Sequence, residues 1–237
     1  MAISTKYRTE ETEIMDDFSI QGEELREALD KIASINQLLG GNRLTLSGVK
    51  QLLERSDVSE PVVIADIGCG NGDMLRMLAA YASKNSLNLK MVGVDANPFT
   101  INYARMLSSG YPDIEYVCTD IFSKDFSTLR YDIVLCTLTL HHFTNAQIIN
   151  IITTFNDNAA MGIIVNDLHR SRLAYRLFQI ICVLFGLNRM SRQDGLVSIL
   201  RGFKKKELVS FSKSLKLKNY TVRWKWAFRY QWIISKI

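Results

Sequence analysis

Two carboxylates flank a glycine-rich turn in the first half of the chain. Asp66 lies at the end of an apolar run, the spacing Gly68-x-Gly70-x-Gly72 follows, and Asp73 opens a helical pattern. A strand, a tight turn and a helix start expose backbone N–H groups, and glycine lets a ligand approach that backbone closely. Two carboxylates would repel a pyrophosphate, whereas they would attract a ligand with an ammonium and a sulfonium. The turn therefore favours a nucleotide-like ligand that carries positive charge.

A further acid follows the next expected strand. Residues 90–94 end at Asp95, whose carboxylate can accept hydrogen bonds from two vicinal ribose hydroxyls. A dinucleotide-binding turn would have the spacing Gly-x-Gly-x-x-Gly, which differs from this one. A glycine turn in some other α/β protein is the alternative, and the acids beside the glycines argue against it.

Together these features resemble motif I of the class I S-adenosylmethionine (SAM) methyltransferases. The resemblance implies SAM as the cofactor, and it places Asp120 where the family has an acid that accepts the adenine amino group. Arg43 could pair with the SAM carboxylate through its forked guanidinium, the alternative being a surface position at a helix end. The predicted cofactor-binding residues are Asp66, Gly68, Cys69, Gly70, Asp95, Ala96, Asp120, Ile121, Thr137 and Arg43.

Strand and helix patterns alternate along most of the chain, which predicts a parallel sheet covered on both faces. The last two strands are joined so tightly that they should form an antiparallel hairpin. The predicted fold is α/β: a Rossmann-like, seven-stranded, mostly parallel sheet with helices on both faces, a C-terminal antiparallel hairpin and an N-terminal helical cap. The expected strands cover residues 62–67, 90–94, 114–118, 131–137, 160–165, 221–228 and 230–235.

A helical pattern precedes the first strand. Apolar residues recur at three- and four-residue steps from Gln21 to Leu53, with a break at Gly40-Gly41. We expect residues 1–60 to form an N-terminal tail, mobile before about Tyr7, and a helical cap. Residues 61–237 then form the methyltransferase domain, in which residues from about 170 to 215 supply lid or substrate helices.

Composition limits the class of protein. The chain has 237 residues, which is enough for one domain with a sizeable core. Its four cysteines are scattered, without a CxxC pair or a paired spacing with histidine, so they indicate reduced thiols and no metal site. Residues 1–17 are polar and charged, unlike a signal peptide, which predicts a cytoplasmic protein. The net charge of +5 arises from Lys and Arg that gather late in the chain.

All three histidines follow predicted strands. His141 and His142 come after the fourth strand, and His169 comes after the fifth. Ligands bind beyond the carboxyl ends of the strands in a doubly wound sheet. A histidine with a pKa near 7 can remove the proton of a phenolic hydroxyl that is to be methylated. We therefore predict His141, His142 and His169 as catalytic residues; the alternative is a histidine that only caps a helix or bonds a loop carbonyl.

The later motifs resemble those of more particular groups. Leu140-His141-His142-Phe143 resembles the Leu-His-Asp-Trp stretch of plant phenolic O-methyltransferases, in which the histidine is the general base, although His142 replaces the aspartate. The same stretch resembles ubiquinone/menaquinone methyltransferases. Residues 35–43, 166–170 and 194–203 resemble bacterial methyltransferases associated with type III polyketide synthases. These resemblances imply O-methylation of a phenolic or quinol acceptor with a lipid tail, in secondary metabolism.

Other functions are left open: C-methylation of a quinone-type ring, N-methylation of RNA or protein, and SAM binding without catalysis. We expect no nucleic-acid partner, because no RNA-binding module is evident. The apolar run Leu177–Leu187 is too short to span a bilayer and is flanked by arginines. It predicts a lid helix over an apolar aromatic substrate, with peripheral membrane contact, or else ordinary core packing. The sequence does not indicate the oligomeric state.

Overall fold

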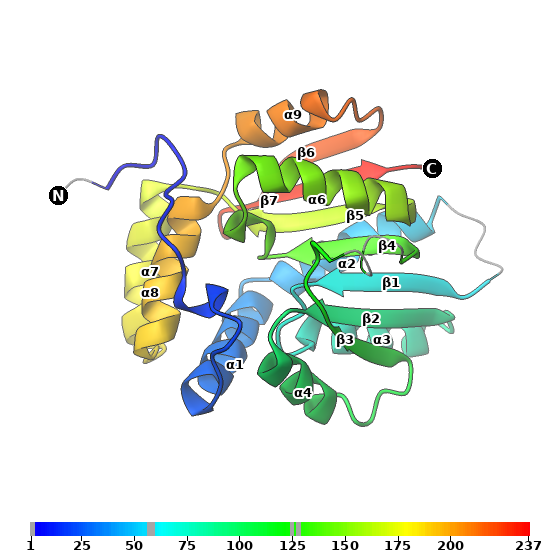
Figure 1. Cartoon of the computed structure of the whole chain (residues 1–237), viewed down its shortest axis with the longest axis horizontal. Coiled ribbons are helices and arrows are strands. Elements are labelled where there is room, and N and C mark those ends of the chain that lie inside the picture. The colour runs from blue at the N-terminus through cyan, green and yellow to red at the C-terminus, as the bar shows by residue number, and fades with distance from the viewer. Residues whose placement is uncertain (1–2, 56–59, 124–125, 127–128) are drawn as a thin grey trace.

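The chain folds around one seven-stranded sheet, seen in a computed structural model that describes residues 3–55, 60–123, 126 and 129–237. The strand order is β3-β2-β1-β4-β5-β7-β6 (Figure 1). Neighbouring strands from β3 to β5 are parallel, and β7 runs antiparallel to both β5 and β6. This confirms the predicted fold class. The strands are β1 (Val62–Ile67), β2 (Leu89–Asp95), β3 (Ile114–Cys118), β4 (Tyr131–Thr137), β5 (Ala159–Leu168), β6 (Tyr220–Lys225) and β7 (Arg229–Ser235).

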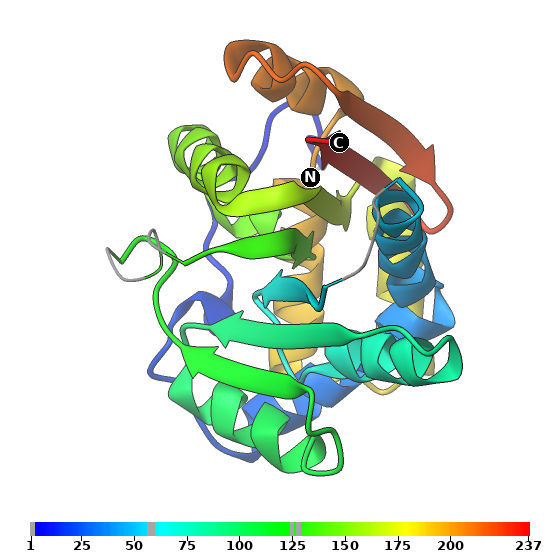
Figure 2. The same cartoon turned by 90° about the vertical axis from the view of Figure 1, so that its right-hand side faces the viewer.

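Helices cover both faces of the sheet, because the central strands are apolar on both sides. The side chains of α2, α3 and α4 pack in one buried cluster, and those of α6 and α9 pack in another. Figure 2 shows α6 and α2 on opposite sides of the strands. The described helices are η1 (Ile14–Asp16), α1 (Glu23–Leu38), α2 (Gly41–Leu53), α3 (Asp73–Lys84), α4 (Pro98–Leu107), η2 (Leu140–His142), α6 (Asn145–Asn158), α7 (Arg172–Leu184), α8 (Arg189–Arg201) and α9 (Lys205–Ser214).

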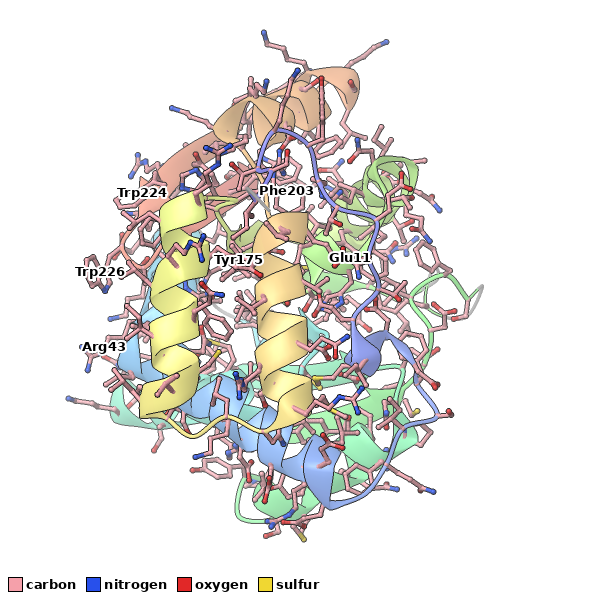
Figure 3. All side chains as sticks on the ribbon, turned by 90° about the vertical axis from the view of Figure 1, so that its left-hand side faces the viewer. Glu11, Arg43, Tyr175, Phe203, Trp224 and Trp226 are labelled. Carbon is pink, nitrogen blue, oxygen red and sulfur yellow. The ribbon has the colours of Figure 1, made fainter. Side chains whose placement is uncertain are left out.

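A cap of helices lies beyond the carboxyl ends of the parallel strands. In Figure 1 the arrowheads of β1 and β4 point toward α1, α7 and α8, which stand together at that end. The cap joins segments that are far apart in the sequence, since α1 precedes the sheet whereas α7 and α8 follow β5. Within it, α7 and α8 lie side by side (Figure 3).

The segment before α1 is tied to the cap. Arg8 donates hydrogen bonds to the backbone oxygens of His141 (2.6 Å) and Phe143 (2.8 Å). Arg170, which is fully buried, donates to the backbone oxygens of Thr5 and Lys6. Such bonds hold the backbone of residues 5 and 6 in place, so the expectation of a free tail before Tyr7 is corrected for them.

Two strand ends differ from the sequence prediction by more than one residue. Strand β5 continues to Leu168 rather than ending at Val165, because the polar side chains of Asn166 and Asp167 find partners in α2 and η2. Strand β6 ends at Lys225, since Ala227 and Phe228 adopt positive φ values in the turn that follows. The extension of β5 matters because it carries Asp167 to the edge of the sheet where the cap begins.

Candidate active site

A cavity of about 1520 Å³ lies between the carboxyl edge of the sheet and the cap. Its walls come from the glycine-rich turn after β1, the ends of β2, β4 and β5, the N-terminal segment, α1 and α7. The turn between β6 and β7 closes one side with Trp226 and Phe228. A space of this size, bounded by both ends of the chain, is large enough for a nucleotide-sized ligand and a second molecule.

The glycine-rich turn has the tight backbone conformation that the sequence predicts. Gly68, Gly70 and Gly72 have φ values of +69°, +53° and +77°, in the left-handed region that favours glycine. A Cβ atom on Gly68 would lie 2.4 Å from the hydroxyl oxygen of Thr139. The Gly70 N–H donates to Asp95 Oδ2 at 3.3 Å, which joins the turn to the end of β2.

Several acids lie close together at the turn. Asp66 is 2% exposed, and its Oδ1 atom has no hydrogen-bond partner among the residues that the structure describes. Burial, and then the nearby charges of Asp73 and Asp95, raise the pKa of Asp66 well above its usual range. Asp73 is already engaged, because it accepts a hydrogen bond from Asn42 Nδ2 at 2.6 Å. The free oxygen of Asp66 is therefore suited to a cationic ligand group.

The predicted cofactor residues on the strand ends line the cavity together. Asp95 Oδ1 accepts from the Asn97 N–H at 3.0 Å, and Asp120 Oδ1 accepts from the Phe122 N–H at 2.9 Å. Thr137 lies at the end of β4, and its hydroxyl is 3.0 Å from that of Thr45 on α2. The cavity-lining members of the predicted set are Asp66, Gly68, Cys69, Gly70, Asp95, Ala96, Asp120, Ile121 and Thr137.

Arg43 is the exception. Its side chain is exposed on the outside of α2 and does not line the cavity (Figure 3). The neighbouring polar residues Asn42 and Thr45 form the buried side of the helix, which turns Arg43 outward. The prediction that Arg43 pairs with a SAM carboxylate is therefore wrong. Asn36 and Asn42, which hydrogen-bond each other, occupy the cavity side instead.

His141 is held by acids on both sides. Its Nδ1 atom is 2.7 Å from Asp167 Oδ1, and its backbone N–H donates to Asp167 Oδ2 at 3.1 Å. Its Nε2 atom faces Glu13 Oε1 at 3.5 Å without a hydrogen bond. Burial alone would lower the pKa of His141, but Asp167 and Glu13 outweigh burial and raise it to about 9. His141 is therefore protonated at neutral pH while Glu13 stays in place.

His142 stacks on His141 and faces a different acid. The two rings lie 4.4 Å apart, and His142 Nδ1 is 2.6 Å from Asp16 Oδ1. Arg201 on α8 donates to Asp16 Oδ2 at 2.6 Å and also to the backbone oxygen of His142. The two histidines thus belong to one network with the N-terminal segment and α8.

His169 lies apart from that network. Its Nδ1 atom accepts a hydrogen bond from Trp224 Nε1 at 3.1 Å, next to the turn between β6 and β7. Partial burial, and then the positive charges of Lys204 and Arg170, lower its pKa. The three histidines all line the cavity, but the structure brings only His141 and His142 together.

The acids of the N-terminal segment were not predicted as site residues. Glu13 is 6% exposed, although it sits in a polar stretch that looks solvated in the sequence. Asp194 accepts the backbone N–H groups of Ile14 (2.7 Å) and Met15 (2.9 Å) and so holds Glu13 in position. The one sequence signal was Asp194 itself, which belongs to a stretch singled out by resemblance alone.

A metal ion would find three donors here. Among the described residues, Glu13, His141 and His142 offer ligand atoms that lie within 4.8 Å of one another. The guanidinium of Arg201 already lies 4.0 Å from Glu13 Oε1, and Asp16 and Asp167 engage both Nδ1 atoms. The cluster is better described as a hydrogen-bonded network that holds protons.

Comparison with known proteins identifies the central part of the chain. Residues 64–162, from β1 into β5, match the family model described as "Methyltransferase domain". This central part of the chain is therefore similar to a methyltransferase domain. The match confirms the predicted enzyme class, a methyltransferase, and the SAH-bound structures described next agree with the predicted cofactor.

The relatives of this domain are distant. A methyltransferase-named protein, 235L of Invertebrate iridescent virus 6, is 26% identical over 98 residues, or 41% of this chain and 34% of the viral protein. The chain thus matches about a third of that relative. The structure of the plantazolicin methyltransferase BpumL with SAH has a TM-score of 0.61 at 18% identity, covering 88% of this chain and 89% of that one. Magnesium protoporphyrin IX methyltransferase from Synechocystis PCC 6803 has a TM-score of 0.55 at 16% identity, covering 83% and 84%. At these identities the two structures show a shared fold.

The acids of the methyltransferase domain can be tested by SAM binding. We expect Asp95→Ala to weaken SAM affinity by about 30- to 150-fold, because it removes charge-assisted hydrogen bonds of about 2–3 kcal/mol. Isothermal calorimetry measures this, with Asp157→Ala, an exposed acid of α6, as the matched control. SAM affinity that is equal in the two variants would remove Asp95 from the cofactor site.

Proposed function

We propose that this protein transfers the methyl group of SAM to the hydroxyl of a phenolic or quinol acceptor, with His141 as the general base. The observation that supports this most is the buried His141–Asp167 pair in the cavity that also holds the acidic turn. The Nε2 atom of His141 has no hydrogen-bond partner within the described part of the chain. It is the atom that can accept a proton from an acceptor hydroxyl.

The chain's own residues supply alignment and proton removal. SAM, when bound, provides a methyl group on a sulfonium that leaves without the help of an acid. Asp66 and Asp95 would hold the cationic and ribose parts, and the cavity walls exclude water from the reaction. Asp167 accepts the Nδ1 proton of His141, which keeps Nε2 free to act as the base. The acceptor oxygen forms its bond to the methyl carbon while its proton passes to Nε2.

Glu13 controls when His141 can act. With the Glu13 carboxylate 3.5 Å from Nε2, the imidazole retains its proton at neutral pH, as its pKa of about 9 indicates. An acceptor hydroxyl must reach the same Nε2 atom, so it would take the place of Glu13. Displacing that carboxylate lowers the pKa of His141, and the base becomes available when the acceptor is bound. In this proposal the N-terminal segment that carries Glu13 covers the base.

Substitution of His141 tests whether this residue is the general base. We expect His141→Gln to lower turnover by about 10²- to 10⁴-fold, because the acceptor proton loses its base. SAM affinity should stay near wild type, since His141 lies outside the acidic turn. Steady-state kinetics and calorimetry measure the two effects separately.

Substitution of Glu13 tests whether its carboxylate controls the pKa of His141. The base works when neutral, so kcat/KM should rise with pH toward the His141 pKa of about 9. Glu13→Gln removes a charge that raises this pKa, and the rise should move to lower pH. Glu11→Gln is the matched control, because Glu11 is exposed in the same segment (Figure 3). Unchanged pH profiles for both variants, together with a normal rate for His141→Gln, would contradict the mechanism.

We also propose that the acceptor is apolar and that α7, within a lid formed by residues of about 170–215, is its roof. Leu177, Ile180 and Ile181 of α7 line the cavity. Only Ala174 and Cys182 of this helix are buried, which argues against the alternative of ordinary core packing. The outer side of α7 is apolar too, and Val183 and Leu184 are each 75% exposed.

Tail length should therefore control efficiency. Each methylene of an acceptor tail that is buried under α7 contributes about 0.8 kcal/mol, or roughly a fourfold gain in kcat/KM. The measurement compares resorcinols with short and long alkyl tails under identical detergent conditions. Equal efficiency, or a preference for the ring without a tail, would assign the protein to small phenols.

The outer face of α7 suits an anionic membrane surface, and we propose peripheral contact there. The exposed Trp224 and Trp226 project on the same side of the molecule as α7 (Figure 3). After Asp167 the sequence has sixteen Lys and Arg residues against two acids, Asp194 and Glu207, and both of these acids accept hydrogen bonds within the fold. No helix in the described part of the chain is long and apolar enough to cross a membrane. Tryptophan beside cations is typical of interfacial binding.

Vesicle binding tests this contact. We expect sedimentation with vesicles that contain phosphatidylserine and little sedimentation with phosphatidylcholine alone, because the attraction is partly electrostatic. Trp226→Ser should reduce binding, whereas Trp232→Phe, at a fully buried tryptophan, should leave it unchanged if the fold is intact. Equal recovery with both vesicle types, or with neither, would contradict the proposal.

A further inference from the structure

Arg229 is a charged residue of the cavity that the proposed reaction does not use. It begins β7, opposite Leu168 of β5, and it lines the cavity. Gln231, two residues later and on the same face of the sheet, donates to the backbone oxygen of Leu44 on α2 at 2.8 Å. The alternation along a strand thus places Arg229 on the α2 side, at the carboxyl edge of the sheet.

Two donor atoms of the Arg229 guanidinium are buried without a hydrogen-bond partner among the described residues. The residue is 3% exposed, and its Nε and Nη1 atoms have no hydrogen bond to any residue that the structure describes. Asp167 attracts it electrostatically, but the Asp167 oxygens already accept bonds from His141 and from the Leu168 N–H. Burial lowers the pKa of Arg229 to about 10, so the group still carries its charge at neutral pH.

Apart from Asp167, the described groups next to the Arg229 guanidinium supply no negative charge. Its Cζ atom is 3.1 Å from the position that a Cβ on Gly41 would take, at the first residue of α2. The amino-terminal end of a helix favours a negative group. Asn36, beside Gly41, is neutral, and its Oδ1 atom also lacks a hydrogen-bond partner among the described residues. A buried cation of this kind destabilises a fold unless something pairs with it.

We propose that Arg229 binds the carboxylate of a ligand in the cavity. The planar guanidinium offers two parallel N–H donors that match the two oxygens of a carboxylate. Two sources of this carboxylate fit the cavity: the amino-acid end of SAM, and an acid group on the ring of the acceptor. The inference goes beyond the proposed function, since it concerns binding and holds for any chemistry at His141.

The distance between Arg229 and the acidic turn restricts the SAM carboxylate more than it restricts an acid group on the acceptor. Asp66 lies on β1 and Arg229 on β7, with β4 and β5 between them. Three strand spacings amount to about 14 Å. The ammonium and carboxylate of SAM are attached to the same carbon atom, so both sites can serve SAM only if the long Arg229 side chain spans most of that distance. An acceptor acid can reach Arg229 without this requirement.

A binding experiment with paired ligands tests the proposal without turnover. Wild type, Arg229→Gln and Arg43→Gln are compared by calorimetry, and Arg43 is the matched control because it is exposed outside the cavity. One arm compares SAM with decarboxylated SAM. The other arm compares 3,5-dihydroxybenzoate with resorcinol on protein saturated with SAH.

In one of the two arms, we expect Arg229→Gln to weaken the binding of the ligand that has a carboxylate by about 10- to 100-fold, the usual effect of one charge-assisted pair. The affinity for the ligand without the carboxylate should change less than about twofold. Selective loss in the SAM arm assigns the cofactor's carboxylate to Arg229, and selective loss in the benzoate arm assigns the acceptor's. Affinities that stay unchanged, or fall equally for both members in each arm, would overturn the proposal.

Thermal unfolding of the ligand-free proteins separates binding from a structural role. Because an unpaired buried charge is removed, Arg229→Gln should unfold at the same temperature as wild type or higher. Arg229→Lys retains the charge without the paired donors, so its selective loss of affinity should be smaller. A lower unfolding temperature for both variants, with non-selective loss of affinity, would make Arg229 a structural residue and overturn the proposal.

Discussion

The fold of the site depends on one buried imidazole held between carboxylates from distant parts of the chain. Asp167 reaches His141 from β5, and Glu13 reaches it from the N-terminal segment. These three side chains are almost entirely buried, which is tolerable because opposite charges and N–H donors surround each of them. The same contacts keep the N-terminal segment over the cavity. His141 and the segment that covers the cavity are therefore one electrostatic unit, and any movement of Glu13 changes access to His141 and its charge together.

Charge is distributed unevenly along the cavity. The acids Asp66 and Asp95 gather at the ends of β1 and β2, whereas the unpaired guanidinium of Arg229 lies at the start of β7. Both Asp66 and Arg229 lack full hydrogen bonding within the described residues, so each lowers the stability of the empty protein. Such groups are retained where a bound ligand supplies the missing interactions. The lower stability of the empty protein is a common cost of a preorganised site. The sheet provides the rigid spacing between the two ends.

Local sequence patterns were sufficient for the sheet and for the acidic turn. An apolar run predicts β1, and the glycine spacing after it predicts the tight turn. Both patterns can be read within a few residues of the sequence, although the packing that requires glycine at Gly68 and Gly72 comes from the distant Thr139 and Tyr116. Arg43 shows the limit of this reasoning, because helical periodicity gives two faces without saying which one is buried. Asn42 and Thr45 are buried through partners on α3 and β4, and those partners cannot be read from α2 alone.

The rest of the site could not be read from local patterns, since the contacts of Glu13 and of its neighbours Ile14 and Met15 reach residues more than a hundred positions away. Glu13 resembles Glu11 in sequence. The bonds from Ile14 and Met15 to Asp194, and from the Ser198 hydroxyl to Glu13, hold Glu13 in a buried position, whereas Glu11 is exposed. The side of the cavity away from the acidic turn is built in the same way, from the N-terminal segment, α7 and the turn after β6. These parts pack against the edge of the sheet and are not among its paired parallel strands. Their side chains can therefore differ between proteins while the acidic turn stays intact, which is why a motif that identifies the cofactor says little about the acceptor.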